Sequence, residues 1–345
     1  MYELPSASAT TTLRGINPLI FTQGTIDRIL QLTAAVDNSV RFDTVAPDTN
    51  GKITAPFGAE VVLVNSSDNF VAAMTPPTNA PVIVFQGKGG VNVRFEDTSS
   101  ASVPDNKVDR VIVGTNSTDK FVLADTRDNQ LNLGSGNSVV QTGGGNDTVI
   151  AGLGNSTVVG GTGNAIVQLS GNAADYKVTV KDGHAIVTNL KDLKTTDITN
   201  LQFVQLDGTQ ALVFAEDFKE AGVATIYEAA LGRTPDAKGL DFWLDAVRAG
   251  VTLESIAQSF LNSTEYQALP AQDNQQFLTK LYRNTFDRAP DAEGLAWWTK
   301  VLDSGVSRAS VLAGFVSDAG QSLEGTAAHV EPVVVGSVTV VHNIV

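Results

Sequence analysis

The sequence predicts a multidomain protein of the β plus α class, in which a parallel β-solenoid is followed by an all-α domain of two tandem repeats. Three observations predict this order. Short strand-like runs fill the N-terminal part, a nine-residue repeat occupies residues 106–168, and one helical sequence occurs twice between residues 214 and 325. A chain of 345 residues can hold two or three domains with cores of their own. We expect a β-rich N-terminal region, the solenoid with its coda, the helical domain and a C-terminal β-strand, at residues 1–105, 106–213, 214–325 and 326–345.

The N-terminal part contains β-prone runs separated by turn signals. AEVVLV (59–64) and VNVRFE (91–96) are examples, and segments such as NSSDN and GKGG lie between the runs. One stretch, GTIDRILQLTAAV (24–36), has a helical period instead, and Thr25 is placed to cap that helix.

In the middle part an aliphatic residue recurs at every ninth position. These residues are Val113, Val122, Leu131, Val140, Val149, Val158 and Val167. Glycine and Asn or Asp recur at fixed offsets on the same count. Such a period predicts a coil in which each nonamer supplies a turn and a short strand, and stacked turns bury the aliphatic column. Glycine lets the turn backbone reach positive φ, and Asn or Asp side chains can form hydrogen-bonded ladders between turns.

The nonamers resemble the G-G-x-G-x-D-x-U-x repeats of RTX, or haemolysin-type, proteins, which bacteria export by type I secretion. The later segment TTDITNLQFVQLDGT (195–209) is similar to the strand-rich coda of that family, T-D-x-L-x-N-V-E-x-L-x-F-x-D-G. The family carries its export signal uncleaved at the C-terminus. The resemblance therefore implies an extracellular location, at the bacterial cell surface or in a matrix, although the N-terminus lacks a signal-peptide pattern.

The same resemblance implies calcium, because the family's turns place an Asp at the sixth nonamer position among backbone carbonyls. In this chain only Asp147 stands at that position, and two nonamers per turn would set it beside Asn129 and Ala165. Two interpretations stay open: calcium held at Asp147, or a mostly metal-free coil held by Asn ladders. Three upstream acids could form an irregular calcium site or be solvated turn residues: Asp119, Asp125 and Asp128.

The helical part repeats itself at a constant offset, the one that separates Tyr227 from Tyr282. Its motif residues are Arg233, Pro235, Asp236 and Trp243, which recur as Arg288, Pro290, Asp291 and Trp298. Proline suits the first turn of a helix, and Asp favours the positive end. The signature R-x-P-D-x-x-G-L-x-x-W resembles the domain of unknown function numbered 4214, found in secreted and surface-associated bacterial proteins.

Two roles are open for the charged and aromatic motif residues. We expect the arginines to pair with nearby helix-end carbonyls or carboxylates, although a ligand-binding pair is the alternative. By spacing, Trp243, Trp297 and Trp298 belong to core faces, and sugar stacking by one of them is the bolder interpretation.

Composition excludes several classes of protein. The net charge of −14 argues against a nucleic-acid partner, and no apolar run approaches the ~20 residues of a membrane span. There is no cysteine, and the three histidines, at 184, 329 and 342, lie outside any catalytic motif. The glycine-rich segments lack the spacing of a phosphate loop. We therefore expect a protein that is not an enzyme.

These observations favour a self-assembling extracellular structural protein: a subunit of a surface layer, filament or biofilm matrix, with copies of itself as partners. The tail EPVVVGSVTVVHNIV (331–345) must be covered by its own chain, a neighbouring subunit or the export machinery, because it is apolar on both alternating faces. Assembly by β-addition is assigned to Leu19, Ile20, Phe21, Val333, Val334, Val335, Val338 and Val340. The alternative is a secreted calcium-dependent adhesin or glycan-binding module for a cell-surface polysaccharide, which exposed aromatic residues in a groove would favour.

Overall fold

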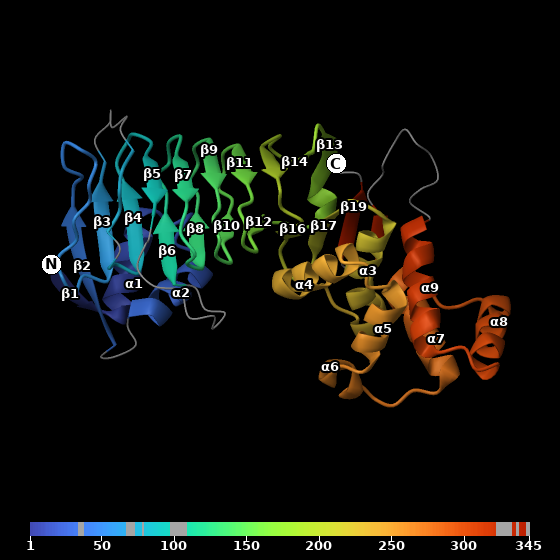
Figure 1. Cartoon of the computed structure of the whole chain (residues 1–345). Helices are drawn as coiled ribbons and strands as arrows, with labels where there is room; N and C mark the ends of the chain where they lie inside the picture. The colour runs from blue at the N-terminus through green and yellow to red at the C-terminus, as the bar shows by residue number, and fades with distance from the viewer. Residues whose placement is uncertain are drawn as a thin grey trace. The chain divides into compact units, whose positions relative to one another are not determined.

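The structure, a computed structural model, describes residues 1–33, 38–66, 73–77, 79–96, 109–321, 333–335 and 338–342 (Figure 1). The chain divides into two compact units. The first is Met1–Leu169 with Ile186–Leu201, and the second is Ser170–Ala185 with Gln202–Val345. The N-terminal part is β-rich, and a helical region with a final strand follows it.

One sheet of the first unit is parallel except at its edge. Its strands pair in the order β2 (Ser39–Val45), β3 (Val61–Asn65), β4 (Val82–Gln86), β6 (Arg110–Val113), β8 (Asn129–Asn132), β10 (Thr148–Ile150) and β12 (Ile166–Gln168). The short strand β1 (Tyr2–Pro5) pairs antiparallel with β2. Because β4 pairs directly with β6, strand pairing does not separate residues 1–105 from the repeats.

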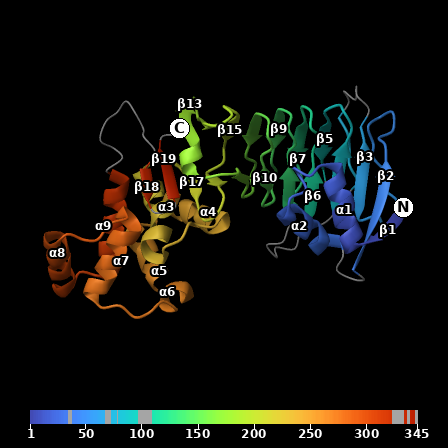
Figure 2. The same ribbon diagram turned by 180° about the vertical axis from the view of Figure 1, so that it is seen from behind.

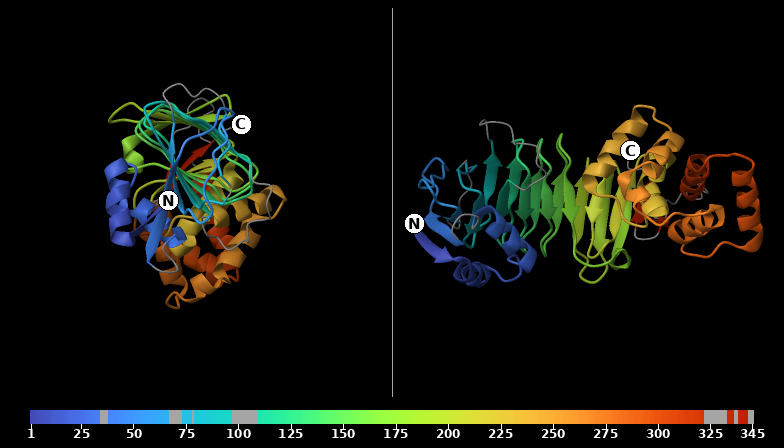
Figure 3. Two further views of the ribbon diagram at one scale, coloured as in Figure 1. Left: turned by 90° about the vertical axis from the view of Figure 1, so that its left-hand side faces the viewer. Right: turned by 90° about the horizontal axis from the view of Figure 1, so that it is seen from below.

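The second sheet of this unit consists of parallel strands that alternate along the chain with those of the first. They are β5 (Asn92–Phe95), β7 (Lys120–Leu123), β9 (Ser138–Gln141), β11 (Ser156–Val159) and β15 (Thr195–Thr199). Val149 pairs with Leu131 and Val167, so each of these partners lies two nonamers away in the sequence. One nonamer thus leads from one sheet to the other, and the next leads back. The view from below shows these strands side by side (Figure 3).

The buried column between the two sheets follows the predicted period from Leu131 to Val167, whereas the prediction is wrong at Val113 and Val122. Ile112 pairs with Leu131, and Phe121 pairs with Val140, both at a separation one residue longer than two nonamers. Phe121 is fully buried, while Val122 is only half-buried. One extra residue between β7 and β8 shifts the column by one position, and a shift of one residue moves every side chain of a strand to the opposite face.

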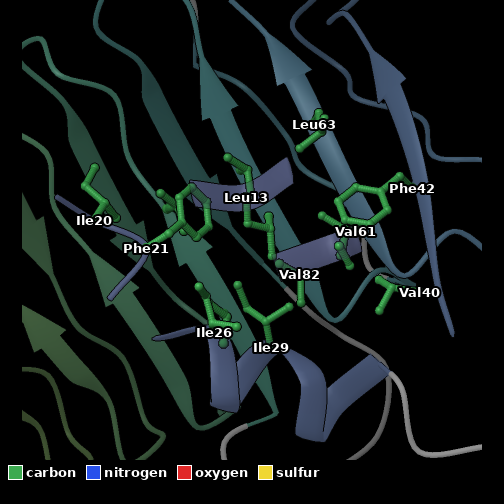
Figure 4. Close-up of a cluster of buried hydrophobic side chains, with 14 residues drawn as sticks. Leu13, Ile20, Phe21, Ile26, Ile29, Val40, Phe42, Val61, Leu63 and Val82 are labelled. Atoms are coloured by element: carbon green, nitrogen blue, oxygen red, sulfur yellow. The ribbon is translucent and has the colours of Figure 1, made fainter. Parts of the chain in front are cut away.

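Two helices cover the outer face of the first sheet near its N-terminal edge. They are α1 (Ser6–Ile16) and α2 (Gln23–Thr33), and both lie in front of that sheet in Figure 2. Their side chains, Leu13 and Ile29 among them, form a buried cluster with valines of the sheet such as Val61 and Val82 (Figure 4). Val113 belongs to the same cluster. This cluster holds Val113 on the face opposite to the inner column. The sequence predicts α2, of which residues 34–36 lie outside the described residues, but it does not predict α1.

Thr25 does not cap α2 as predicted. It lies inside the helix and is buried, and its hydroxyl donates to Asn132 Oδ1 at 3.1 Å. Thr22, one residue before the helix, holds its hydroxyl 3.4 Å from the Thr25 backbone nitrogen. The capping position is therefore three residues earlier than predicted.

The second unit contains a short sheet and a set of helices. Strands β16 (Phe203–Gln205), β17 (Ala211–Ala215), β19 (Val338–His342) and β18 (Val333–Val335) pair in this order, and β19 is parallel to β17. The 3-10 turn η1 (Ala173–Asp175) and strand β13 (Tyr176–Lys181) come before them, and β14 (His184–Asn189) contains the boundary between the units. The helices are α3 (Phe218–Leu231), α4 (Ala237–Arg248), α5 (Leu253–Leu261), α6 (Thr264–Gln267), α7 (Asn274–Phe286), α8 (Ala292–Asp303) and α9 (Arg308–Gln321).

Each copy of the helical repeat begins and ends its motif helix in the same way. Asp236 accepts a hydrogen bond from Gly239 N at 2.8 Å to cap α4, and Asp291 accepts one from Gly294 N at 2.7 Å to cap α8. The prolines precede these caps, so they lie two residues before the first helical residue and outside the first turn in which they were predicted. Gly250 and Gly305 follow the two helices with φ of 93° and 99°, a region that favours glycine. None of the helices in the described ranges is long and apolar enough to cross a membrane.

Candidate functional site

The acid that the sequence places at the sixth nonamer position, Asp147, lies in the interior between the two sheets and is 1% exposed. Its Oδ1 accepts hydrogen bonds from Asn129 N at 3.1 Å and Asn129 Nδ2 at 2.8 Å, and its Oδ2 accepts one from Gly143 N at 3.0 Å. The neighbour predicted two nonamers away is therefore in place. Burial raises the pKa of Asp147 to about 6, although these hydrogen bonds act in the opposite direction.

Asn129 connects Asp147 to a buried ion pair. Arg110 Nη1 lies 2.8 Å from Asp125 Oδ2, and both side chains are almost completely buried. Arg110 also donates to Asn129 Oδ1 at 3.2 Å and lies over the Phe95 ring, with 4.8 Å from Cζ to the ring centroid. The guanidinium of Arg110 therefore supplies the buried carboxylate of Asp125 with a partner from its own chain.

The two other predicted metal ligands belong to separate hydrogen-bond networks. Asp119 accepts from Val91 N, Thr115 N and Thr115 Oγ1, and its burial raises its pKa. Asp128 accepts from Asn146 N at 2.7 Å, two nonamers further along the sequence. The structure brings Asp125 and Asp147 together through Asn129 but leaves Asp119 and Asp128 apart from them. Within the described part of the chain, no group of three or more His, Asp or Glu side chains is placed to hold a metal ion.

The polar ladders predicted between turns are present. Asp128 accepts from the Asn146 side chain, and Asn137 Oδ1 accepts from Asn155 N at 3.0 Å. Asn155 Oδ1 in turn accepts from Thr195 N at 3.0 Å. These bonds join residues about two nonamers apart in two of the three cases, and Asn155 joins the repeats to β15 in the third.

In the first helical repeat the motif arginine is fully paired. Arg233 donates from Nε and Nη2 to the Glu265 carboxylate at 2.5 and 2.8 Å, and its guanidinium lies 5.3 Å from the Tyr227 ring centroid. Its hydrogen bonds to Glu265 raise the pKa of Arg233 and lower that of Glu265. This two-bonded geometry is the strong form of an Arg–carboxylate pair.

In the second repeat the equivalent arginine is less constrained. Arg288 Nη1 lies 3.5 Å from Asp291 Oδ2, and its guanidinium lies 5.1 Å from the Tyr282 ring centroid. The residue of the second repeat that corresponds to Glu265 is Gly320. The second repeat therefore has no carboxylate at the position from which Glu265 pairs with Arg233. The side chain of Arg288 is 53% exposed, compared with 38% for Arg233.

The aromatic residues of the two repeats form matching clusters with one exposed member each. Trp243 packs against Phe260 at 5.6 Å between ring centroids, and Trp298 packs against Phe315 at 5.1 Å. The prediction of a core position is wrong for Trp297, whose surface is 57% exposed. Its counterpart in the first repeat, Phe242, is 62% exposed. Each of these residues precedes the core-facing Trp by one position, and one residue turns a helix by about 100°.

Two adjoining hollows between α7 and α8, with volumes of about 660 Å³ and 530 Å³, are missed by the sequence analysis. Both have Gln275 and Leu295 in their walls. The first is otherwise lined by Asp273, Gln276, Thr279, Lys280, Arg283 and Asn284, and the second by Ala292, Ala296, Thr299, Lys300 and Asp303. A residue-by-residue comparison of the two repeats would have indicated them, because all six α7 residues in their walls are polar, whereas three of the six equivalent α3 residues are alanine.

The residues predicted to mediate assembly have different environments. Ile20 and Phe21 are buried in the cluster beneath α1 and α2, while Leu19 is 68% exposed. Val338 and Val340 are fully buried in β19. The third group, Val333–Val335, forms β18 at the end of its sheet, and residues 331–332, 336–337 and 343–345 of the tail lie outside the described residues.

Comparison with known families matches the helical part of the chain. The family described as Domain of unknown function (DUF4214) matches residues 213–270 and, in a second copy, residues 257–321. The duplicated helical part therefore carries this domain twice. No curated protein and no solved structure matches the chain.

Proposed function

We propose that the chain is a structural protein of the bacterial exterior, exported by a type I pathway, that assembles with copies of itself into a surface layer, filament or biofilm matrix. The observation that carries this proposal is the parallel pairing, in two sheets, of repeat strands that lie two nonamers apart. This pairing supports a parallel β-solenoid of the RTX-like kind, with two strands per turn. Each turn of a solenoid contacts only its neighbours, so geometry is what such repeats supply.

The hydrogen bonding of the interior carboxylates favours a scaffold over an enzyme. Asp119, Asp125 and Asp147 are 1–3% exposed and accept hydrogen bonds from groups of their own chain. A catalytic acid or base must reach a proton on its substrate, which these side chains do not do from the interior. Calcium stays a proposal for Asp147, Asp119, Asp125 and Asp128 taken separately, because these acids form no single cluster in the described residues, and binding would require calcium to displace these hydrogen bonds.

We assign assembly to β18, which is the outermost strand of the short sheet among the residues that the structure describes. An edge strand offers unpaired backbone groups, and a partner copy could add a strand there by β-addition. A head-to-tail contact of this kind extends into an open polymer. Leu19 is a second, exposed contact candidate. We do not assign assembly to four of the predicted residues, because they are buried in the core of the monomer: Ile20, Phe21, Val338 and Val340.

Negative-stain electron microscopy of the purified full chain, with calcium and with a chelator, tests the proposal. The variant replaces Val333, Val334 and Val335 by serine, and Val139→Ser removes an exposed valine from β9 as a control. We expect ordered polymers from the wild-type chain and the control, and monomers with an unchanged circular dichroism spectrum from the variant. Polymers formed only with calcium would support the Asp ligands. If the wild-type chain forms no polymer in either condition, the assembly function is contradicted.

A second candidate function, a glycan-binding module, is favoured by the exposed aromatic pair. Phe242 and Trp297 occupy equivalent positions, and both leave more than half of their surface in water. An exposed aromatic ring offers an apolar face on which a sugar ring can stack, and both of these side chains are accessible for such a contact. Sedimentation with insoluble polysaccharide tests this function: Phe242→Ala and Trp297→Ala should each weaken retention, whereas Leu153→Ala, which removes an exposed leucine of the first unit, should not.

A further inference from the structure

The hollows between α7 and α8 occupy a place that the first repeat keeps closed. Six α7 residues that line them correspond, at the repeat offset, to six α3 residues that are buried. The pairs are Gln275 with Glu220, Gln276 with Ala221, Thr279 with Ala224, Lys280 with Thr225, Arg283 with Glu228, and Asn284 with Ala229. The same face is therefore an interior packing surface in one repeat and a polar, accessible surface in the other.

The ionic contact that closes the first repeat is absent from the second. Arg248 Nε donates to Glu220 Oε1 at 2.7 Å and so bridges α4 and α3. The corresponding residues of the second repeat are Asp303 and Gln275, which cannot form an ion pair. Both of them line the hollows instead.

The walls of the hollows carry a small excess of basic side chains in a chain whose net charge is −14. The walls contain three basic side chains, those of Lys280, Arg283 and Lys300, and two acidic ones, those of Asp273 and Asp303. Their net formal charge is therefore 3 − 2 = +1. Asp273 Oδ1 accepts from Gln276 N at 2.8 Å, and Asp303 Oδ1 accepts from Asn274 Nδ2 at 3.1 Å. No carboxylate of the described residues lies within 4.0 Å of the three basic groups. Lys280 is half-buried over the Tyr266 ring, and this burial lowers its pKa.

The remaining wall residues suit a hydroxylated ligand. Gln275, Gln276 and Asn284 present amides, and Thr279 and Thr299 present hydroxyls, while Leu295 with Ala292 and Ala296 supplies an apolar wall. Amides and hydroxyls both donate and accept, as sugar hydroxyls do. The larger hollow, at about 660 Å³, falls in the range of roughly 300–1,000 Å³ typical of small-molecule sites. The second, adjoining hollow extends the surface to more than one sugar ring.

We propose that these adjoining hollows bind an acidic saccharide, with Lys280 and Arg283 pairing with its carboxylates and the amide side chains with its hydroxyls. This inference rests on the second candidate function, recognition of a polysaccharide, and names its ligand class and its site. The guanidinium of Arg283 can hold a carboxylate through two parallel hydrogen bonds, whereas the ammonium of Lys280 acts as a point charge. The first repeat has no such site, because Glu228 and Thr225 stand at these positions and are buried.

Isothermal titration calorimetry of the purified full chain with trigalacturonate tests the proposal, with maltotriose as the neutral ligand of the same length. We expect trigalacturonate to bind at least 10-fold more tightly than maltotriose, and its affinity to fall as sodium chloride is raised. Lys280→Gln and Arg283→Gln should each weaken binding 10-fold or more, and Arg283→Lys should recover part of that loss. Lys219→Gln, which removes an exposed positive charge from α3, should change affinity less than 2-fold. Circular dichroism checks that each variant is folded.

Several results would overturn the proposal. Unchanged affinity in both glutamine variants would leave polysaccharide recognition in place but move it to another surface, such as the exposed aromatic pair. Equal affinity for maltotriose, or displacement of trigalacturonate by equimolar inorganic sulfate, would show that the hollows do not recognise an acidic sugar specifically. If no saccharide binds, the second candidate function falls together with the site, whereas the assembly function is judged separately by electron microscopy.

Discussion

Asn129 donates from its side-chain amide to the carboxylate of Asp147 at 2.8 Å, although the two residues stand two full nonamers apart in the sequence. This bond joins the starts of two strands, β8 and β10, that are paired neighbours in one sheet. Asn129 also contacts the Arg110–Asp125 ion pair, so one amide side chain links three charged groups in the interior. The polar network and the aliphatic column are thus parts of one stacked structure.

The raised pKa of Asp147 predicts a pH-dependent stability. A carboxyl whose folded-state pKa lies near 6, above its usual 3.8, binds its proton more tightly in the folded chain. Its stabilising contribution is complete below pH 3.8 and is lost as the pH rises through 6. Between pH 5 and pH 7.5 we expect wild-type unfolding free energy to fall by about 1.4 kcal/mol more than that of Asp147→Asn. Urea titrations at these pH values measure this difference, and parallel pH profiles would contradict the assignment.

The buried ion pair predicts a strong and reversible mutational effect. Arg110→Met leaves the carboxylate of Asp125 buried without its cation, which costs about 3–5 kcal/mol of unfolding free energy. Adding Asp125→Asn removes the isolated charge, so the double variant should be more stable than Arg110→Met alone. Denaturant unfolding of the three proteins forms the test. A double variant at least as unstable as the sum of the single changes would show that the pair has no coupled role.

The one-residue shift of the buried column predicts opposite sensitivities at adjacent positions. Phe121 is fully buried opposite Val140, whereas Val122 is half-buried. Phe121→Ala should cost about 3–5 kcal/mol, and Val122→Ala less than about 1 kcal/mol. Urea midpoints of the first unit compare the two variants directly. A larger loss of stability from Val122→Ala than from Phe121→Ala would contradict the shift and favour an uninterrupted nine-residue column.

The sequence predicts the coil where its turns have constant length. Glycines at fixed offsets keep the period from Leu131 to Val167, because a side chain would not fit between stacked turns: a Cβ at Gly152 would lie 1.7 Å from Gly134 O. The extra residue before Leu131 has no such signature, so Val113 and Val122 are misassigned. The helix caps Asp236 and Asp291 are predictable from local chemistry alone.

The features missed by the sequence analysis depend on tertiary contacts. Helix α1 has a threonine-rich sequence of low helix propensity and forms with Ala9 and Leu13 buried against the sheet. Trp297 looks like a core residue because it adjoins Trp298, but the helix turns it into solvent. The hollows between α7 and α8 form because the helix face that is buried in the first repeat is accessible in the second. The sequence of one repeat alone does not show which of its helix faces is covered.

The central claim is that repeat strands two nonamers apart stack in parallel, and disulfide trapping tests it most directly because the chain has no cysteine. Val139 pairs with Thr157 on neighbouring strands, about 4.8 Å apart, within disulfide reach. Val139→Cys with Thr157→Cys should form an intramolecular disulfide on mild oxidation. Val139→Cys with Thr148→Cys, one nonamer apart and on different sheets, should stay reduced. Cross-linking of the pair with Thr148 but not of the pair with Thr157 would contradict the stacked coil.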